Sequence, residues 1–304
     1  KLRNTGLELN LNALLMKTKD INWNFNINFA YNKSKILELG QNGAPIYLAA
    51  NFISSSAGQQ AVILQEGQSI GSIYGYVVDG VYGANDFYSD GTVKPGVAVE
   101  GVGEAPGWIK YKDMENNGVK DGKITAEDRR VIGNTLPDFY GAFSTNFSWH
   151  DFDLHLGFQY SYGNDVFNAN YIQAARFGST MYNQMKFYND RWTINNTEST
   201  QYAHMSVGTI SSAFVEDASF LRFKTARLTY SLPDKWLAKT KTIKNMKVYV
   251  SADNIYTFTR YSGYDPEVTG TQSAGNMTKV LTSGFDYGVF PRARTFTAGL
   301  NIIF

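Results

Sequence analysis

The residues with the clearest pattern for metal chemistry lie in YKDMENNGVKDGKITAEDRRVIG, residues 111–133. The second half, DGKITAED, matches the back of a calcium loop, in which carboxylate and carbonyl oxygens surround a sharp glycine turn. In this match Gly122 makes the turn and Ile124 is the inward apolar residue. The ligands are then Asp121 at position 5, the Lys123 carbonyl, Thr125 at position 9 and Asp128 at position 12.

The front half of this segment departs from the calcium-loop pattern. Counting back places Asn117 at position 1 and Val119, which has no ligand atom in its side chain, at position 3. With a four-residue insertion Asp113 becomes the first ligand, and Glu115, Asn116 or Asn117 the second. A final Asp in place of a bidentate Glu weakens binding. We predict a structural Ca²⁺ site formed by Asp113, Asn117, Asp121, Lys123, Thr125 and Asp128. The alternative is a polar loop of Asx turns held by hydrogen bonds.

Catalytic chemistry finds no support in the remaining residues. His150 lies in a tight turn, His155 on a polar strand face and His204 in a long connection. The chain has no cysteine and no HExxH motif, so it offers no thiol nucleophile and no zinc-protease site. The isolated glycines between 35 and 112 form no phosphate loop. A formal net charge of +1 gives no reason to expect nucleic acid. We predict that the protein is not an enzyme.

Alternating apolar and polar side chains indicate the elements that hold these loops. The clearest case is INWNFNINFAYNK, where Trp23, Phe25, Ile27 and Phe29 oppose a row of asparagines. The same period of two recurs in seven stretches: 5–17, 21–33, 139–149, 152–162, 219–232, 246–258 and 295–304. Strands of about 10 to 14 residues exceed the soluble norm of about 5 to 6 and match tilted membrane strands. No apolar run reaches the 18 to 20 residues of a spanning helix.

The connections alternate strictly between short and long. Residues 18–20, 150–151 and 233–245 are short, whereas 35–138, 164–216 and 259–291 are long. Outer-membrane barrels have this asymmetry, with long extracellular loops on one side. Tyr74, Tyr76, Tyr82 and Trp108 in the first long connection either stack on sugar rings or pack the loop itself. We predict barrel strands in 1–34 and 139–304, extracellular loops at 35–138, 164–216 and 259–291, and the calcium segment within 111–133.

Seven strands do not close a barrel, because bacterial single-chain barrels have even strand numbers and an open edge in lipid is costly. We therefore predict an all-β fold that is the C-terminal part of a large transmembrane β-barrel, with the rest N-terminal to Lys1. The final strand, FTAGLNIIF, resembles the terminal aromatic signal of outer-membrane barrels, with Phe304 last. Aromatic residues near the strand ends fit a membrane girdle, although β-propensity alone also enriches tyrosine.

Six stretches carry a family resemblance: 4–39, 67–83 (GQSIGSIYGYVVDGVYG), 109–168, 217–233 (DASFLRFKTARLTYSLP), 245–268 (with YSGYDPEV) and 290–304. In this order they resemble the C-terminal region of SusC/RagA-type TonB-linked outer-membrane proteins of Bacteroidota. The resemblance implies a 22-stranded barrel with an N-terminal plug, a TonB-contacting segment and a SusD-like surface lipoprotein as lid. It also implies a Gram-negative outer membrane and the import of oligosaccharides or peptides.

Two other hypotheses compete with a SusC-like transporter. The first is a soluble or surface-anchored β-sandwich stabilised by Ca²⁺, a glycan-binding module whose apolar face is buried against a second sheet. The second is a TonB-dependent receptor for siderophores or cobalamin, which shares the barrel but not the lipoprotein. The stretches YSGYDPEV and DASFLRFKTARLTYSLP favour the SusC type over this receptor.

Overall fold

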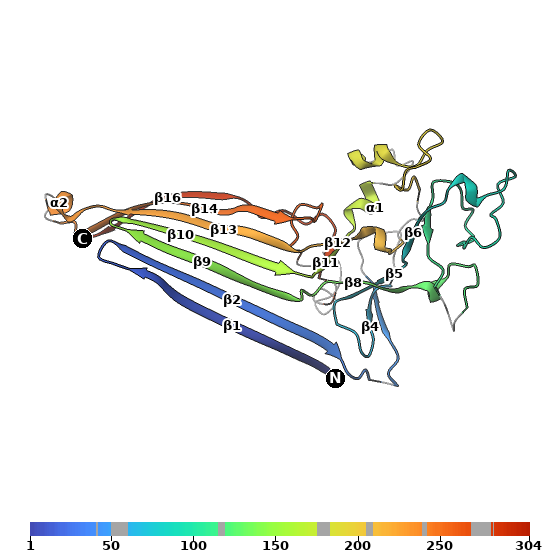
Figure 1. Cartoon of the computed structure of the whole chain (residues 1–304), viewed down its shortest axis with the longest axis horizontal. Helices are drawn as coiled ribbons and strands as arrows, with labels where there is room; N and C mark the ends of the chain where they lie inside the picture. The colour runs from blue at the N-terminus through green and yellow to red at the C-terminus, as the bar shows by residue number, and fades with distance from the viewer. Residues whose placement is uncertain are drawn as a thin grey trace.

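The computed structural model describes residues 1–40, 42–49, 60–114, 119–174, 183–204, 209–238, 242–268, 281 and 283–304. A long antiparallel sheet forms one part of the molecule, and the long connections gather at one end of it (Figure 1). The opposite end holds the short turns, the short helix α2 (Asp234–Leu237) and the C-terminus. Sheet and loops therefore divide the chain as the alternation of short and long connections predicts.

The sheet confirms the seven predicted strands. Its order is β1-β2-β9-β10-β13-β14-β16, so each strand lies beside its neighbour in the series. The bounds are β1 Leu2–Lys17, β2 Ile21–Ile36, β9 Phe139–Trp149, β10 Phe152–Tyr162, β13 Phe220–Ser231, β14 Asn245–Thr259 and β16 Thr295–Ile303. Every neighbouring pair in this sheet is antiparallel. The up-and-down order follows from the parity of the connections, because each short turn joins adjacent strands at the same end.

The register places mostly like side chains side by side across neighbouring strands. Leu11 pairs with Ile27, and Ile27 pairs with Phe143, which pairs with Phe158. On the other face Asn12 pairs with Asn26, and Asn26 with Ser144. Cross-strand partners share a face, so the period of two extends laterally over all seven strands. We call the two sides, which these pairs define, the apolar face and the polar face.

Bulges explain the two places where the alternation in the sequence is imperfect. In β13 the register shifts between Phe223 and Thr225, which inserts Lys224 and moves the apolar positions from odd to even numbers. Leu221 and Phe223 therefore share a face with Leu228 rather than opposing it. A second shift between Leu14 and Met16 makes Met16, and not Leu15, the partner of Trp23. In both strands the extra residue of the bulge returns the following apolar side chains to the apolar side, where a regular strand would place them on the opposite side.

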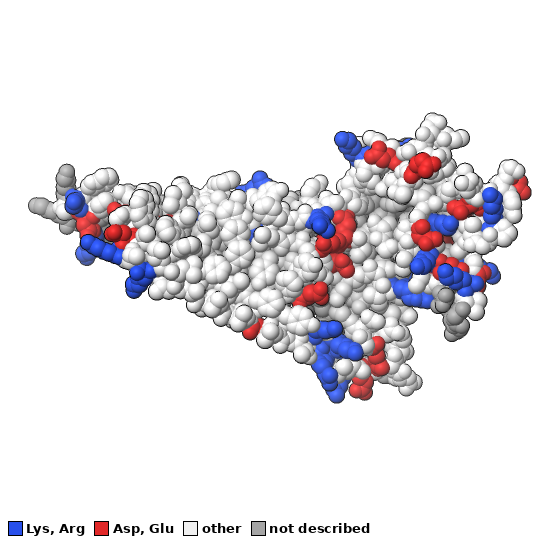
Figure 2. All heavy atoms as spheres, viewed as in Figure 1, with Lys and Arg blue, Asp and Glu red and all other residues white. Residues whose placement is uncertain are grey.

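The apolar face has no second protein layer over it within the described residues. Leu7 and Leu9 are 64% and 58% exposed, and large apolar side chains of the other strands are exposed too. Figure 2 shows a sheet surface almost without charge, with Lys, Arg, Asp and Glu gathered at its two ends. This contradicts the β-sandwich hypothesis, which requires a second sheet against this face. The described helices include none that is long and apolar enough to cross a membrane.

Aromatic side chains mark both ends of the apolar face. Near the long connections Phe139 stacks on Tyr162 with ring centroids 4.9 Å apart, and near the short turns Phe152 lies 4.7 Å from Tyr230. From Ile21 to Tyr31 the strand advances ten residues (31 − 21), which is about 33 Å at 3.3 Å per residue. At a tilt of about 40° this covers roughly 25 Å, the height of the apolar band of membrane barrels.

The long connections fold into a unit that the alternation pattern does not reveal. We call the described residues of 37–138, 163–219 and 260–294 the loop body. Its strands are β3 Ile46–Ala49, β4 Gln60–Leu64, β5 Ser72–Gly75, β6 Val78–Val81, β7 Ile109–Tyr111, β8 Arg130–Asn134, β11 Asp165–Asn168, β12 Val215–Asp217 and β15 Phe285–Asp286. Its helices are α1 Asn170–Ala174 and the 3-10 turns Ala84–Asp86, Ala126–Asp128, Lys186–Asp190 and Ser212–Phe214. The sequence predicts loops over these intervals, and that prediction is incomplete because they hold short strands and helices.

One hydrophobic core joins the three connections of the loop body. It includes Val62, Ile73 and Tyr111 from the first connection, Phe167, Tyr188 and Phe214 from the second, and Phe285 from the third. Gly75 allows the backbones to meet, because a Cβ there would overlap the Ile210 carbonyl. Polar links reinforce the core: the Asn168 side-chain amide and the Ser262 hydroxyl each donate to Glu216 Oε1 at 2.8 Å. The long connections therefore behave as one packed body at one end of the sheet.

The two faces of β2 give a stability prediction. Phe25 lies on the apolar face between Ala13 and Thr145, and Asn26 on the polar face between Asn12 and Ser144. Phe25→Arg should lower the free energy of unfolding by about 2 to 4 kcal/mol if this position lies near the bilayer midplane. Asn26→Asp should leave it nearly unchanged. Urea unfolding of the full-length protein in lipid vesicles measures both; equal effects would contradict the assignment of faces.

Candidate functional site

The polar face of the sheet carries hydrogen-bonding groups in every strand. Asn146 Oδ1 lies 2.7 Å from His155 Nδ1, and His155 pairs in register with Arg227. The Ser148 hydroxyl donates to Asp153 at 2.6 Å, and Thr225 donates to Asp253 at 2.8 Å. β2 contributes uncharged amides at 22, 24, 26 and 28. Amides both donate and accept, so this face offers many polar contacts to a neutral solute without fixing one charge.

A pocket of about 510 Å³ lies where the polar face meets the loop body. Side chains from the sheet and from all three connections line it, among them Asn28, Tyr140, Gln159, Asp165, Phe220 and Glu267. Burial raises the pKa of the Asp165 carboxyl, and the nearby carboxylates of Asp217 and Asp138 act in the same direction against the backbone N–H of Asn134. The pocket combines amides, the carboxyl groups of Asp165 and Glu267, and aromatic rings, which together suit a polar organic solute.

A buried arginine holds the third connection against the sheet beside this pocket. Arg222 of β13 is only 1% exposed, and its Nη2 and Nη1 lie 2.5 Å from Asp265 Oδ1 and 2.7 Å from Glu267 Oε2. Its Nε donates to the Thr257 hydroxyl at 3.0 Å. Arg292 binds the other oxygen of Glu267 at 2.8 Å. Each of the three guanidinium nitrogens thus has a hydrogen-bond partner, which offsets the cost of burying this cation.

This network was not predicted from the sequence. Asp265 and Glu267, in the last long connection, are the two anions that neutralise Arg222. The available signal is an arginine on the polar side of a strand together with two carboxylates in the last long connection. The pairing joins residues 43 apart in the chain, so spacing alone does not reveal it.

The predicted calcium residues are held mainly by hydrogen bonds to the backbone. Asp128 accepts from the backbone N–H of Met114 at 2.9 Å and of Thr125 at 2.7 Å, and Asp113 accepts from Gly122 at 2.8 Å. Asp121 accepts from the Lys123 N–H at 2.8 Å. Asn117 lies outside the described residues. No group of three or more His, Asp or Glu suited to a metal occurs in the described part of the chain. The calcium site stays a prediction. The observed hydrogen bonds fit the alternative, a polar loop of Asx turns.

The loop aromatics pack against neighbours within the loop body. The Tyr82 hydroxyl donates to the Ala98 carbonyl at 2.6 Å, and the Tyr76 and Tyr111 ring centroids are 5.2 Å apart. Trp108 lies 4.1 Å from the ring of His204. The sequence left two roles open for these aromatics, stacking on sugar rings or packing of the loop itself. The observed contacts fit packing of the loop. The three histidines lie in the elements that the sequence predicts. His150 is in the β9–β10 turn, His155 is in β10 and His204 is in the loop body.

Comparisons with known proteins find that the chain is similar to TonB-dependent receptors. No family model matches it. TonB-dependent receptor P3 of Formosa agariphila is 34% identical over 310 residues, and TonB-dependent receptor SusC of Bacteroides thetaiotaomicron 26% over 307. Both alignments cover all of this chain but only 29% and 26% of the relatives. The RagAB peptide transporter structure matches 99% of the chain and 29% of its own, with a TM-score of 0.76 at 23% identity. The resemblance to SusC/RagA-type proteins and the barrel architecture are confirmed.

The buried position of Arg222 gives a second stability prediction. Arg222→Gln leaves the buried Asp265 without its cation, whereas Glu267 keeps Arg292. Breaking a buried pair in this way should cost about 3 to 5 kcal/mol. Arg227→Gln is the matched control, because Arg227 lies on the same strand but is exposed, with its guanidinium 4.0 Å from the Tyr249 ring centroid. Urea unfolding together with tryptic cleavage after Arg260 measures the effect. Equal stability of the two variants would contradict the structural role of Arg222.

The calcium prediction has its own test. Ca²⁺ at roughly 1 mM, the range of extracellular calcium modules, should raise the melting temperature of the full-length protein. Asp121→Asn should abolish the increase, whereas Asp90→Asn, in another turn of the same connection, should preserve it. Differential scanning calorimetry with and without EDTA reports the shift. No shift on adding or removing Ca²⁺ would leave hydrogen bonds alone as the support of this loop.

Proposed function

We propose that this chain, whose homologues along its whole length are TonB-dependent receptors, is part of the wall and outer loops of an outer-membrane import barrel. The observation that carries the proposal is the two-faced sheet with every long connection at one end, in a chain of this ancestry. The relatives are receptors and transporters and not enzymes, as the sequence predicts. The chain spans less than a third of their length, so the activity belongs to a longer protein.

The solute pathway follows the polar face. In a barrel whose apolar face contacts lipid, the asparagines of β2 and the polar residues of β9 and β10 line the lumen. Their amides and hydroxyls suit sugar hydroxyls and peptide groups, which need hydrogen bonds rather than a fixed opposite charge. The pocket of about 510 Å³ beneath the loop body would then be one contact point on this path. We infer that the imported solutes are oligosaccharides or peptides.

The relatives' names support the partners that we propose. The similarity to SusC of Bacteroides thetaiotaomicron and to the RagAB peptide transporter supports a SusD-like surface lipoprotein as partner. This lipoprotein would cover the barrel on the loop-body side. The name TonB-dependent receptor supports energy supply through TonB, reached by parts of the protein outside this chain. A structural Ca²⁺ in residues 111–133 remains part of the proposal. The location is the outer membrane of a Gram-negative bacterium.

A receptor for siderophores or cobalamin is the second candidate, because such receptors and SusC-like transporters both depend on TonB. The similarity to SusC and RagAB favours the import of oligosaccharides or peptides. A lipoprotein partner discriminates between the two, since only the SusC-like transporter requires one.

Membrane extraction tests the location. The full-length protein should stay in the outer-membrane fraction through carbonate and high-salt washes, because its apolar face contacts lipid, and leave only with detergent. A peripheral outer-membrane protein serves as the washed-off control. Recovery of the protein in the wash without detergent would contradict a barrel.

Affinity purification tests the partner. A tag on the full-length protein should recover one surface lipoprotein in near-equal amount after mild detergent extraction. Its absence, with the barrel intact and in the membrane, would contradict the SusC-like transporter and favour the receptor for siderophores or cobalamin.

A further inference from the structure

We propose that Arg3, Lys33 and Lys35 bind the phosphate group of a membrane lipid at the loop-body end of the apolar face. The proposal rests on the proposed function, because it takes the apolar face to contact lipid. It concerns a different surface from the solute pathway, which follows the opposite side of the sheet.

Register places the three cations directly in line with the apolar band. Along β1 and β2 the pairs are Leu9 with Phe29, Leu7 with Tyr31, Thr5 with Lys33 and Arg3 with Lys35. Alternate residues of a strand share a face, so Lys33 and Lys35 stand on the same side as Phe29 and Tyr31. The apolar band therefore ends in an aromatic residue and then in a basic group, the order in which a membrane passes from hydrocarbon to headgroups.

The basic group forms no ion pair in the described part of the chain. Arg3 and Lys35 are direct cross-strand partners, and like charges in such a pair are destabilising. The ion pairs of the described residues include none with Arg3, Lys33 or Lys35. All three side chains are exposed, and Figure 2 shows a basic patch at this end of the hairpin with acidic side chains beside it. An anion from outside the chain would remove the repulsion.

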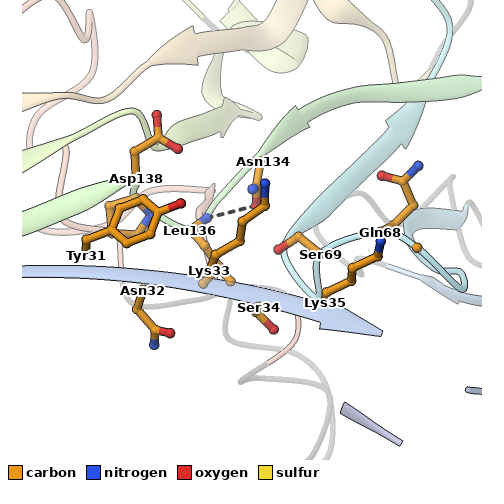
Figure 3. Close-up of a pocket in the computed structure, with 12 residues that line it drawn as sticks. Tyr31, Asn32, Lys33, Ser34, Lys35, Gln68, Ser69, Asn134, Leu136 and Asp138 are labelled. Atoms are coloured by element: carbon orange, nitrogen blue, oxygen red, sulfur yellow. Dashed lines mark hydrogen bonds between the residues drawn. The ribbon is translucent and has the colours of Figure 1, made fainter. Parts of the chain in front are cut away.

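A pocket of about 410 Å³ adjoins the two lysines. Segments 67–69 and 134–138 form its other walls, and Gln68, Ser69 and Asn134 bring polar groups to it. In Figure 3 Tyr31, Lys33 and Lys35 rise from one side of β2 into the pocket, whereas Asn32 and Ser34 point to the other side. Asp138 also lines the pocket near Tyr31 and forms no ion pair with either lysine within the described residues. In Figure 3 the Asp138 carboxylate lies on the Tyr31 side of the pocket, away from Lys35, so we place the anion between Lys33 and Lys35.

The neighbouring apolar band argues for a lipid rather than a free ion. A lipid whose phosphate contacts Lys33 and Lys35 has its acyl chains beside Tyr31, Phe29 and the exposed leucines 7 and 9 of β1. Both parts of the molecule then find complementary surface, and the hydrocarbon contact adds to the charge attraction. A free phosphate would use only the cations, which water and salt screen at an exposed site.

Native mass spectrometry of the full-length protein tests the site after detergent extraction from membranes. The probe is diphosphorylated lipid A. Lys33→Gln/Lys35→Gln should weaken its binding by about thirtyfold, the effect of two lost headgroup cations. The control Lys17→Gln/Lys19→Gln removes two exposed lysines at the short-turn end of the same hairpin and should bind as wild type. Lipid A freed of phosphate should bind wild type and double variant equally weakly.

Three results would overturn the lipid site: unchanged binding by the Lys33/Lys35 double variant, an equal loss in the control variant, or displacement of the lipid by millimolar inorganic phosphate. Failure of the proposed function is seen separately and earlier. In that case the protein leaves the membrane without detergent, and no lipid titration is reached.

Discussion

The structure depends on one constraint, which is that a backbone crossing hydrocarbon has no water to satisfy its N–H and C=O groups. The seven long strands meet it by pairing each neighbour through almost its full length, from β1 to β16. Full pairing fixes the register, and the register fixes which side chains share a face. The bulge at Lys224 shows how strongly this holds, because the chain accepts an irregular ladder in β13 in order to keep Leu228 on the apolar side.

The loop body follows from the same constraint. Long connections leave the sheet at one end, where water is available, and their polar backbones need a core and partners of their own. The core shared by the three connections supplies this, and Arg222 ties the last connection to the sheet through Asp265 and Glu267. A substitution that disturbs the packing of one connection should therefore disturb the packing of the other two. The three connections therefore contribute to the pocket beneath the loop body as a single packed unit, and the sheet forms its other wall.

The sequence predicts the sheet well because its signal is local. Period-two alternation placed β9 and β10 at their observed bounds and the other strands within a few residues, and the terminal strand 295–304 is observed as β16. The parity of the connections predicted the gathering of the loops at one end. The shift of phase in β13 was not predictable, because a bulge depends on the neighbouring strand. The loop body was missed for a related reason: Val62, Phe214 and Phe285 are far apart in the chain and carry no common pattern.

The candidate site was predictable only in part. The asparagine row of β2 was found because it alternates, whereas Arg222 and its carboxylates were not, because their pairing spans two elements. The calcium residues illustrate the converse. A local motif matched from Asp121 to Asp128, and the described side chains use their oxygens to bind backbone N–H groups. A short motif identifies the oxygen atoms that could bind a metal ion, but not the backbone N–H groups that compete for those oxygens.

The most direct test of the central claim, that one face of the sheet contacts lipid and the other water, is accessibility of single cysteines along β2. The chain has no cysteine of its own. Phe25→Cys, Asn26→Cys, Ile27→Cys and Asn28→Cys variants of the full-length protein are placed in lipid vesicles and treated with a membrane-impermeant maleimide. The account predicts alternation, with labelling at 26 and 28 and protection at 25 and 27. Uniform labelling, or labelling at 25 and 27 alone, would contradict it.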